Sequence, residues 1–244
     1  MKLDHADCLE FLATVPSNSV KLIMADPPYF MNYKGLYWDN QWTSEFQYLA
    51  WCDQWVAESA RVLAPGGCLY VWGTTKSDTF LRLKLNVLNK HESLVYQNWI
   101  IWSYDWGGRT QKNFARKHED LLMYSKGKSF TFNADDVRIP YKTKINVRST
   151  AKNNPKGKIP TDVWSKNNHT LSKEYAGWHS TQKPVSLLER IVLANTDPGD
   201  SVLDFFSGSG STAIAALRND RKFIGCEFDK NYYLKSLQRI KELT

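Results

Sequence analysis

The chain has 244 residues and carries 32 basic against 25 acidic side chains, a formal net charge of +7 that favours an anionic partner. This length fits one α/β domain with an insertion, no apolar run approaches a membrane span, and no secretion signal is visible at the amino terminus. The four cysteines, Cys8, Cys52, Cys68 and Cys226, are scattered without close pairs. Their spacing suits neither a zinc site nor a disulfide framework, and it indicates a reducing cytoplasm.

The first predicted elements are a short strand from Leu3 and a helix beginning near Leu9, with Asp7 at their junction. Aspartate is favoured at the amino-terminal cap of a helix, so capping is one role for Asp7. The next segment, Lys21 to Ala25, is apolar and bounded by turn-forming residues. It is therefore predicted to be a short buried strand.

That strand ends in the motif Asp26-Pro27-Pro28-Tyr29. The two prolines stop the strand and remove two backbone donors, which makes the turn stiff. A carboxylate, the Pro27 carbonyl and an aromatic ring are thereby held at the end of a strand where open α/β sheets bind ligands. Such a group can accept two hydrogen bonds from an exocyclic amine while the ring stacks on the base. The alternative is an ordinary turn with an exposed acid.

The middle of the chain alternates predicted helices and strands. An aromatic loop, Phe30 to Trp42, follows the motif directly and is placed to cover a substrate. Apolar spacing then predicts two helices with a buried strand between them, and an antiparallel strand pair at the sheet edge. In chain order these elements are Thr43 to Leu63, Cys68 to Trp72, Thr75 to Val87, Val95 to Tyr104 and Asp120 to Tyr124.

Residues 126–178, which we call the basic region, break this alternation. Eleven Lys or Arg stand against four acidic residues here, and the surplus of seven equals the net charge of the whole chain. Asn, Pro and Gly are frequent, and apolar periodicity is missing. The composition is typical of an insertion that contacts phosphates, and a solvated loop is the alternative.

A strand, a Gly-rich turn and the start of a helix follow one another from Ser201 to Thr212. Gly208 and Gly210 let the backbone approach a ligand without Cβ clashes, and the helix presents its first amides there. A second strand, Lys222 to Cys226, ends in Glu227, at the spacing where dinucleotide folds place a ribose-binding carboxylate. The third glycine of the dinucleotide fingerprint is missing, which argues against NAD. Helices are predicted on either side of this unit, over Val185 to Asn195 and Asp229 to Leu243.

Together the two motifs resemble those of amino-methyltransferases that use S-adenosylmethionine. Asp26-Pro27-Pro28-Tyr29 is similar to the catalytic motif of DNA methyltransferases that act on exocyclic amino groups, and Asp204 to Gly210 is similar to their cofactor loop. Phe205 stands where the family more often has proline. The catalytic motif comes first and the cofactor loop last, which is the order of the β class within that family. The segment Thr181-Gln182-Lys183-Pro184 before the loop adds to the resemblance. The resemblance extends from Leu3 to Tyr233, apart from the basic region.

The resemblance implies an α/β, Rossmann-like methyltransferase fold with a circularly permuted motif order and a mixed seven-stranded sheet. Residues 1–125 would form the catalytic half, 126–178 an inserted target-recognition region, and 179–244 the cofactor-binding half of the same domain. The implied reaction moves a methyl group from S-adenosylmethionine to the N6 amino group of adenine in duplex DNA, after base flipping. Methylation of cytosine N4 is the alternative, although cytosine enzymes more often have serine where this chain has Asp26.

The resemblance also assigns site residues. The catalytic set is Asp26, Pro27, Pro28 and Tyr29, in which Asp26 and the Pro27 carbonyl accept the amino hydrogens and Tyr29 stacks on the base. The cofactor-binding set is Asp7, Thr181, Lys183, Asp204, Phe205, Phe206, Ser207, Gly208, Gly210, Ser211, Thr212, Glu227 and Phe228. Within it, Asp7 would accept from the cofactor's adenine, and Lys183 would pair with its methionine carboxylate. Candidates for the target-base pocket are Trp102, Trp106 and Phe114.

Duplex DNA is the expected partner of the basic region. Its candidate phosphate contacts are Lys142, Lys144, Arg148, Lys152, Lys156 and Lys158. A homodimer and a cognate restriction endonuclease are further partner hypotheses, and no metal site is expected. The competing classes are a nicotinamide oxidoreductase and a DNA-binding module without activity.

Overall fold

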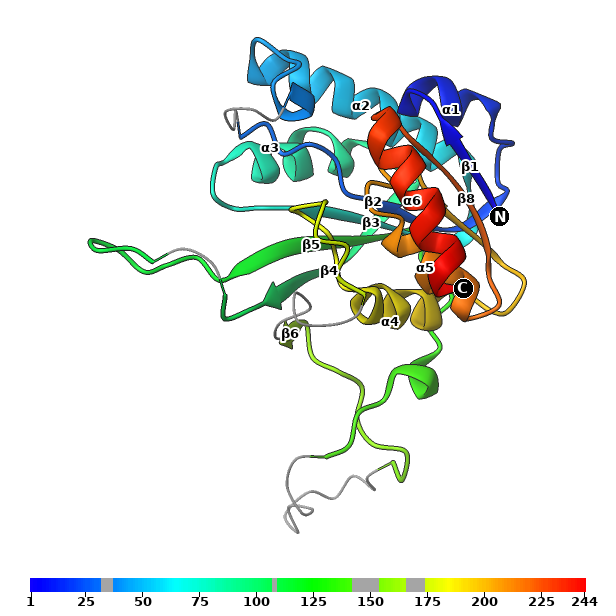
Figure 1. The fold of residues 1–244 in the computed structure, drawn as a ribbon. Coiled ribbons are helices and arrows are strands. Elements are labelled where there is room, and N and C mark those ends of the chain that lie inside the picture. The colour runs from blue at the N-terminus through cyan, green and yellow to red at the C-terminus, as the bar shows by residue number, and fades with distance from the viewer. Residues whose placement is uncertain (32–36, 107–108, 142–153, 166–173) are drawn as a thin grey trace.

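The computed structural model describes residues 1–31, 37–106, 109–141, 154–165 and 174–244, and Figure 1 shows how their elements are arranged. The helices are α1 (Cys8–Thr14), α2 (Glu45–Val62), α3 (Thr79–Asn86), α4 (Val185–Asn195), α5 (Ser211–Arg218) and α6 (Lys230–Leu243), with short 3-10 turns η1 (Tyr37–Asp39), η2 (Leu88–Lys90) and η3 (Ala134–Val137). The strands are β1 (Lys2–His5), β2 (Val20–Ala25), β3 (Leu63–Gly73), β4 (Leu94–Ser103), β5 (His118–Lys126), β6 (Val163–Ser165), β7 (Ser201–Asp204) and β8 (Lys222–Glu227).

Over the described ranges these strands form one eight-stranded sheet in the order β1-β8-β7-β2-β3-β5-β4-β6. The first five of these run parallel, whereas β5 pairs antiparallel with both β3 and β4. The predicted mixed sheet is confirmed, but the predicted number of seven strands is wrong. The additional strand is β6, a three-residue element inside the basic region that pairs in parallel with β4. A run this short carries too little periodicity to be recognised as a strand.

The central strand β2 explains why the sheet is covered on both faces. Leu22 and Met24 pack into one core, Ile23 and Ala25 pack into the other, and all four are buried. Because successive strand residues point to opposite faces, an apolar strand of this kind must be covered twice. Helices α1, α2 and α3 cover one face, and α4, α5 and α6 cover the other (Figure 1). Among the described helices, none is both long and apolar enough to cross a membrane.

Side chains that accept from backbone amides cap the starts of α1, α2 and α6. Asp7 caps α1 by accepting from the Leu9 amide at 2.8 Å, as one of its two predicted roles requires. Asp229 caps α6 through the Tyr232 amide, also at 2.8 Å. α3 begins at Thr79 rather than at the predicted Thr75, and the Thr75 amide, in the turn before the helix, donates to the Asp120 carboxylate.

The described parts of the basic region are anchored to the domain. The Lys126 ammonium donates to the Ala60 and Leu63 carbonyls at 2.7 Å each, so this cation closes the end of α2. The Asn133 amide donates to the Ala194 carbonyl at the end of α4, also at 2.7 Å. Ile139 and Lys158 form a short antiparallel bridge farther out, in the part of the chain that extends below α4 in Figure 1.

Candidate active site

The carboxyl ends of β2, β7 and β8 open into one cavity of about 200 Å³. Asp26 directly follows β2, Gly208 lies in the turn after β7, and Glu227 is the last residue of β8. Glu119 reaches the same edge from the opposite direction, because β5 runs antiparallel to β3 and begins there. The two motifs that the sequence singled out therefore face one space, although they lie in opposite halves of the chain.

The Asp26–Tyr29 turn is held by hydrogen bonds at both ends. The Tyr29 hydroxyl donates to Asp26 Oδ1 at 2.6 Å, and the Tyr48 hydroxyl of α2 donates to the Pro28 carbonyl at 2.8 Å. Phe30, which follows the motif, has a left-handed φ of +54° and turns the chain away from the strand direction. All four residues of the motif line the cavity. The turn is thus preorganised with its acceptors at the ligand edge of the sheet.

Lys183 forms the centre of a group of charges behind this turn. Its ammonium lies 2.7 Å from Asp26 Oδ2 and 3.1 Å from Glu119 Oε2, and we call these three residues the ion cluster. The ammonium is also 3.5 Å from the Tyr29 hydroxyl oxygen. An ammonium has three protons, and three acceptors surround this one. The sequence assigned Lys183 to the cofactor carboxylate, but in the structure its donors are directed to the catalytic turn and to Glu119.

Burial and charge act in opposite directions within the ion cluster. Burial disfavours the Lys183 ammonium, but the Asp26 and Glu119 carboxylates outweigh it, and the pKa of Lys183 lies above its ordinary value. Burial raises the pKa of the Glu119 carboxyl, an effect that the Lys183 charge opposes. The pKa of Tyr29 lies well above its ordinary value because the ring is buried beside Asp26 and Glu119. Tyr29 therefore remains a protonated donor to Asp26.

The Gly-rich turn brings backbone against the cavity wall. Gly208 has a left-handed φ of +48°, and a Cβ placed on it would lie only 2.7 Å from His179 Nε2. Its amide donates to Glu227 Oε2 at 2.7 Å, and the Asp229 amide donates to Oε1 at 2.8 Å. Only glycine combines this conformation with this close approach. The turn thus forms a fitted floor for a ligand, with Glu227 fixed at its side.

Asp204 supports the turn from below. Its two oxygens accept from the Phe206 amide at 2.9 Å and from the Thr212 hydroxyl at 2.6 Å. Burial raises the pKa of the Asp204 carboxyl to about 7, and these two donors oppose the rise. Asp204 lies under the turn and lines a smaller hollow of about 30 Å³ that adjoins the main cavity. Its contacts are those of a residue that shapes the loop.

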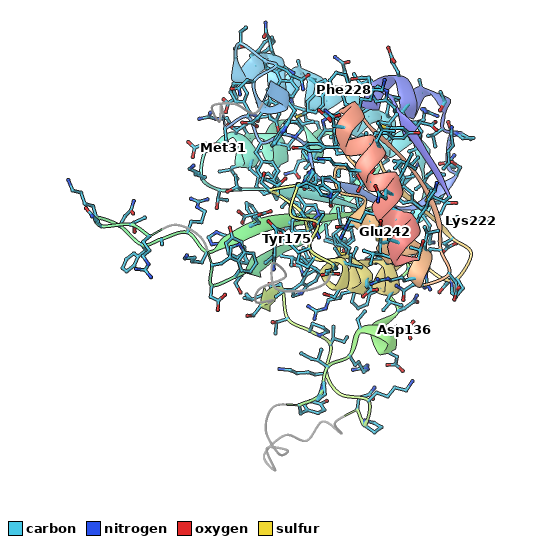
Figure 2. The ribbon with its side chains drawn as sticks, in the orientation of Figure 1. Met31, Asp136, Tyr175, Lys222, Phe228 and Glu242 are labelled. Atoms are coloured by element: carbon cyan, nitrogen blue, oxygen red, sulfur yellow. The ribbon has the colours of Figure 1, made fainter. Side chains whose placement is uncertain are left out.

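The structure brings most of the predicted cofactor residues together. Those that line the main cavity are Asp7, Thr181, Lys183, Phe205, Phe206, Gly208, Glu227 and Phe228. The smaller hollow is lined by Asp204, Ser207, Ser211 and Thr212, together with several residues of the main cavity. Gly210 lines neither space; its φ of +76° starts α5. Phe228 lies beside the first turn of α6, where Figure 2 labels it.

Several lining residues were missed by sequence reasoning. Glu119 is the most important, and its signal was weak because the acid stands at the start of a strand with no glycine or proline beside it. His179 packs on Tyr232 with ring centroids 4.7 Å apart, and burial lowers the pKa of its imidazole to about 4. The ring is therefore neutral near pH 7. Trp51 lies against Phe206, with ring centroids 5.7 Å apart.

The aromatic residues proposed for the target-base pocket lie elsewhere. Trp102 is buried against Trp72 in the core. Trp106 stacks on Tyr104 with centroids 4.4 Å apart, outside the cavity lining. Phe114 is fully exposed, on the long connection between β4 and β5 that projects from the domain (Figure 1). Trp102 therefore belongs to the core, and the role of Trp106 and Phe114 at the target base stays a prediction, because the sequence shows aromatic content but not the direction of a side chain.

The predicted phosphate contacts are only partly within the described residues. Lys142, Lys144, Arg148 and Lys152 lie outside them. The Lys156 ammonium pairs with Asp135 at 2.9 Å and remains largely exposed. Lys158 holds the backbone bridge to Ile139. The two described lysines thus lie together on the extension below α4, and neither of them lines the cavity.

Comparison with known proteins now identifies the family. The family model described as DNA methylase matches residues 20–238. The chain belongs to the DNA methylase family. Two curated relatives cover nearly all of it: type II methyltransferase M1.MboII of Moraxella bovis, 32% identical over 95% of this chain and 93% of the relative, and DNA adenine methyltransferase YhdJ of Escherichia coli (strain K12), 36% identical over 97% and 81%.

Solved structures agree with the fold of this DNA methylase. PvuII DNA methyltransferase (cytosine-N4-specific) matches with a TM-score of 0.77 over 97% of this chain and 85% of the other, at 20% identity. A complex of M1.HpyAVI with SAM matches with a TM-score of 0.67 over 98% of both chains, at 25% identity. The first likeness shows the fold alone. The predicted Rossmann-like methyltransferase architecture is confirmed.

Proposed function

We propose that this DNA methylase transfers the methyl group of S-adenosylmethionine to the N6 amino group of adenine in duplex DNA. The observation that carries the proposal is the shared cavity, in which the Asp26–Tyr29 turn faces the Gly208 turn and Glu227. Membership of the DNA methylase family supplies the reaction class, and the 36% identical relative is named as an adenine enzyme. Adenine is favoured over cytosine because the cytosine-N4 likeness rests on fold at 20% identity.

The cavity suits a nucleoside joined to a sulfonium side chain. Gly208 lines the cavity without a side chain, which lets a ligand lie against the backbone of the turn, and Glu227 lies where a ribose would be bound. Asp7 and Phe228 line the cavity beside Glu227 and would receive the adenine of the cofactor. The cofactor supplies a methyl group on a positively charged sulfur. These residues would direct that group toward the Asp26 side.

The protein's own groups prepare the amine. The lone pair of the adenine amino group is delocalised into the ring, so the nitrogen is a poor nucleophile. Asp26 and the Pro27 carbonyl accept its two hydrogens, which favours a tetrahedral nitrogen with its lone pair free for attack. Tyr29 presents its ring to the base while its hydroxyl fixes Asp26 at 2.6 Å. Positioning of this kind accounts for a large part of enzymatic rate enhancement.

The target base has to leave the duplex, because its amino group is otherwise paired. Flipping costs a few kcal/mol, which contacts to the DNA backbone must offset. Two features of the chain are suited to those contacts: the basic region, and the β4–β5 arm (the described residues of Tyr104–Lys117). In the described part of this arm, Arg109 and Lys112 are exposed and have no carboxylate partner, and Phe114 is fully exposed. We assign the arm and the basic region to the DNA surface.

A product analysis tests the proposal. Purified protein is incubated with plasmid DNA and S-adenosylmethionine that carries a deuterated methyl group, and the DNA is then digested to nucleosides for mass spectrometry. Labelled N6-methyldeoxyadenosine is expected, and the Asp26→Ala variant serves as the matched control. Detection of labelled N4-methyldeoxycytidine instead would show that the substrate is cytosine and not adenine. Sequencing of the methylated plasmid then gives the recognition sequence.

A further inference from the structure

The ion cluster contains two carboxylates but one cation, and the three residues differ in their exposure. The side chain of Lys183 is 7% exposed, whereas those of Asp26 and Glu119 are 24% and 22% exposed. All three residues line the cavity, and Lys183 is the most enclosed of them. The cation also lies 5.1 Å from the centre of the Trp72 ring, which closes the site from the core side.

We propose that Lys183 is a positioning residue that keeps Asp26 ionised and fixed as an acceptor for the amino group, and that Glu119 holds Lys183 in that place. The inference rests on the proposed function, and it replaces the cofactor carboxylate as the partner of Lys183. With acceptors at 2.7, 3.1 and 3.5 Å, the three protons of the ammonium are already directed to Asp26, Glu119 and Tyr29. Both Asp26 oxygens are then fixed, one by Lys183 and one by Tyr29.

The charges around Asp26 explain why the cation is needed. Glu119 shares both Lys183 and the Tyr29 hydroxyl with Asp26, at 3.1 and 3.4 Å from its Oε2. Asp204 adds a further negative charge near Asp26 when it is ionised. His179 interacts electrostatically with Asp26 but is neutral near pH 7, so it supplies no positive charge. Two carboxylates that share a buried site cannot both ionise readily. Without Lys183, the positive charge that opposes the raised pKa of Glu119 would be lost, and a proton shared between the two acids would occupy an oxygen that must accept from the amine.

The first test is Lys183→Met, which removes the charge and preserves the length of the side chain. Single-turnover methylation at saturating DNA and S-adenosylmethionine should fall by on the order of 100-fold at pH 7, as for loss of a general acid–base group. The rate should also rise with pH as the shared proton is lost, whereas the affinity for S-adenosylmethionine should stay within about threefold. A large loss of cofactor affinity with an unchanged rate would refute the proposal and show that Lys183 pairs with the cofactor carboxylate.

The second test is a suppressor. Adding Glu119→Gln to Lys183→Met removes the competing carboxylate, so the double variant should be about tenfold faster than Lys183→Met and less dependent on pH. Two merely structural losses would add, and the double variant would then be the slower one. Lys126→Met is the matched control: it removes another lysine with several acceptors, at the end of α2. It should lower the melting temperature and leave the pH profile of the rate unchanged.

A third measurement does not depend on how well Lys183→Met folds. In Glu119→Gln alone, the amide oxygen can still accept from Lys183, but the negative charge beside Asp26 is gone. The acid limb of the pH–rate profile should therefore move to lower pH than in the wild type. An acid limb that stays in place would refute the coupling between Glu119 and Asp26. Failure of the proposed function is distinct from all these results, because the wild type would then produce no methylated adenine.

Discussion

Replacing Gly208 by alanine tests the fit of the Gly-rich turn in the most direct way. Gly208 has a φ of +48°, a conformation that costs a residue with a Cβ roughly 1–2 kcal/mol. The new Cβ would also lie 2.7 Å from His179 Nε2, so that the imidazole must move. Movement of the turn disturbs the 2.7 Å hydrogen bond from the Gly208 amide to Glu227. A hydrogen bond to a charged group contributes about 1.5–3 kcal/mol, which corresponds to roughly 10- to 150-fold in affinity.

Gly199→Ala is the matched control. Gly199 has a φ of +87°, and a Cβ there would meet no atom within 4 Å. It lies just before β7, at the end of this strand away from the cavity. Both variants should lose stability through backbone strain, and Gly208→Ala should lose more because its Cβ also collides with His179; thermal unfolding measures both losses. Only Gly208→Ala should weaken S-adenosylmethionine binding, measured by calorimetry.

A second substitution sharpens the result. His179→Ala in the Gly208→Ala background removes the ring that the new Cβ strikes, so it should recover the part of the stability that the collision cost. The strain of the left-handed φ should remain. If Gly208→Ala binds the cofactor as well as Gly199→Ala does, the Gly208 turn is not the floor of the cofactor site, and the reasoning fails.

Four further predictions concern single features of the site. Asp26→Ala should abolish methyl transfer while cofactor affinity stays within about tenfold, roughly 1.4 kcal/mol; an equal loss of affinity by calorimetry would place Asp26 in the cofactor site. Glu227→Ala should weaken cofactor binding by about 1–3 kcal/mol, because its two backbone donors lose their acceptor; an unchanged Kd would contradict this role. Because the folded state holds a proton on Asp204 between its ordinary pKa of 3.8 and about 7, unfolding stability should fall as pH rises through this window, and Asp204→Asn should flatten the fall in denaturant titrations. Replacing Lys156 and Lys158 with alanine should reduce the slope of log K against log salt by about 0.9 for each phosphate that is no longer neutralised, with turnover at saturating DNA unchanged; equal slopes would show a solvated surface.

The fold was largely predictable because its signals are local. A buried strand such as β2 is apolar over several residues and is followed by two prolines. The start of helix α1 is marked by the capping acid Asp7. The three-residue strand β6 was not predictable, since its pairing with β4 depends on where the chain returns and not on its own pattern. The start of α3 also differs from the prediction, and the turn before it holds a contact to a distant residue: the Thr75 amide donates to Asp120, 45 residues farther along.

The candidate site likewise contains residues that local motifs predict and residues that only distant contacts bring there. Asp26, Tyr29, Gly208 and Glu227 stand in motifs whose spacing reflects local geometry, and the structure places them around one cavity. Glu119 could not be found from spacing. It lies at the cavity because β5 runs antiparallel to β3 and therefore begins at the edge where β3 ends. The contact between Lys183 and Asp26 was not predicted, because an ion pair across 157 residues leaves no local pattern.

The position of β2 between β3 and β7 has a consequence for synthesis of the chain. β2 can pair with β3 as soon as residue 73 is made, but its other edge waits for β7, which ends at residue 204. Among the strands of the described residues, β1 pairs with β8 alone, so the first strand made depends on the last one. Such distant pairings are slow to form, and open strand edges invite association between chains. A nascent or truncated chain that stops before residue 201 therefore exposes the edge of its central strand, and it should need a chaperone or aggregate until the remaining strands β7 and β8 are added.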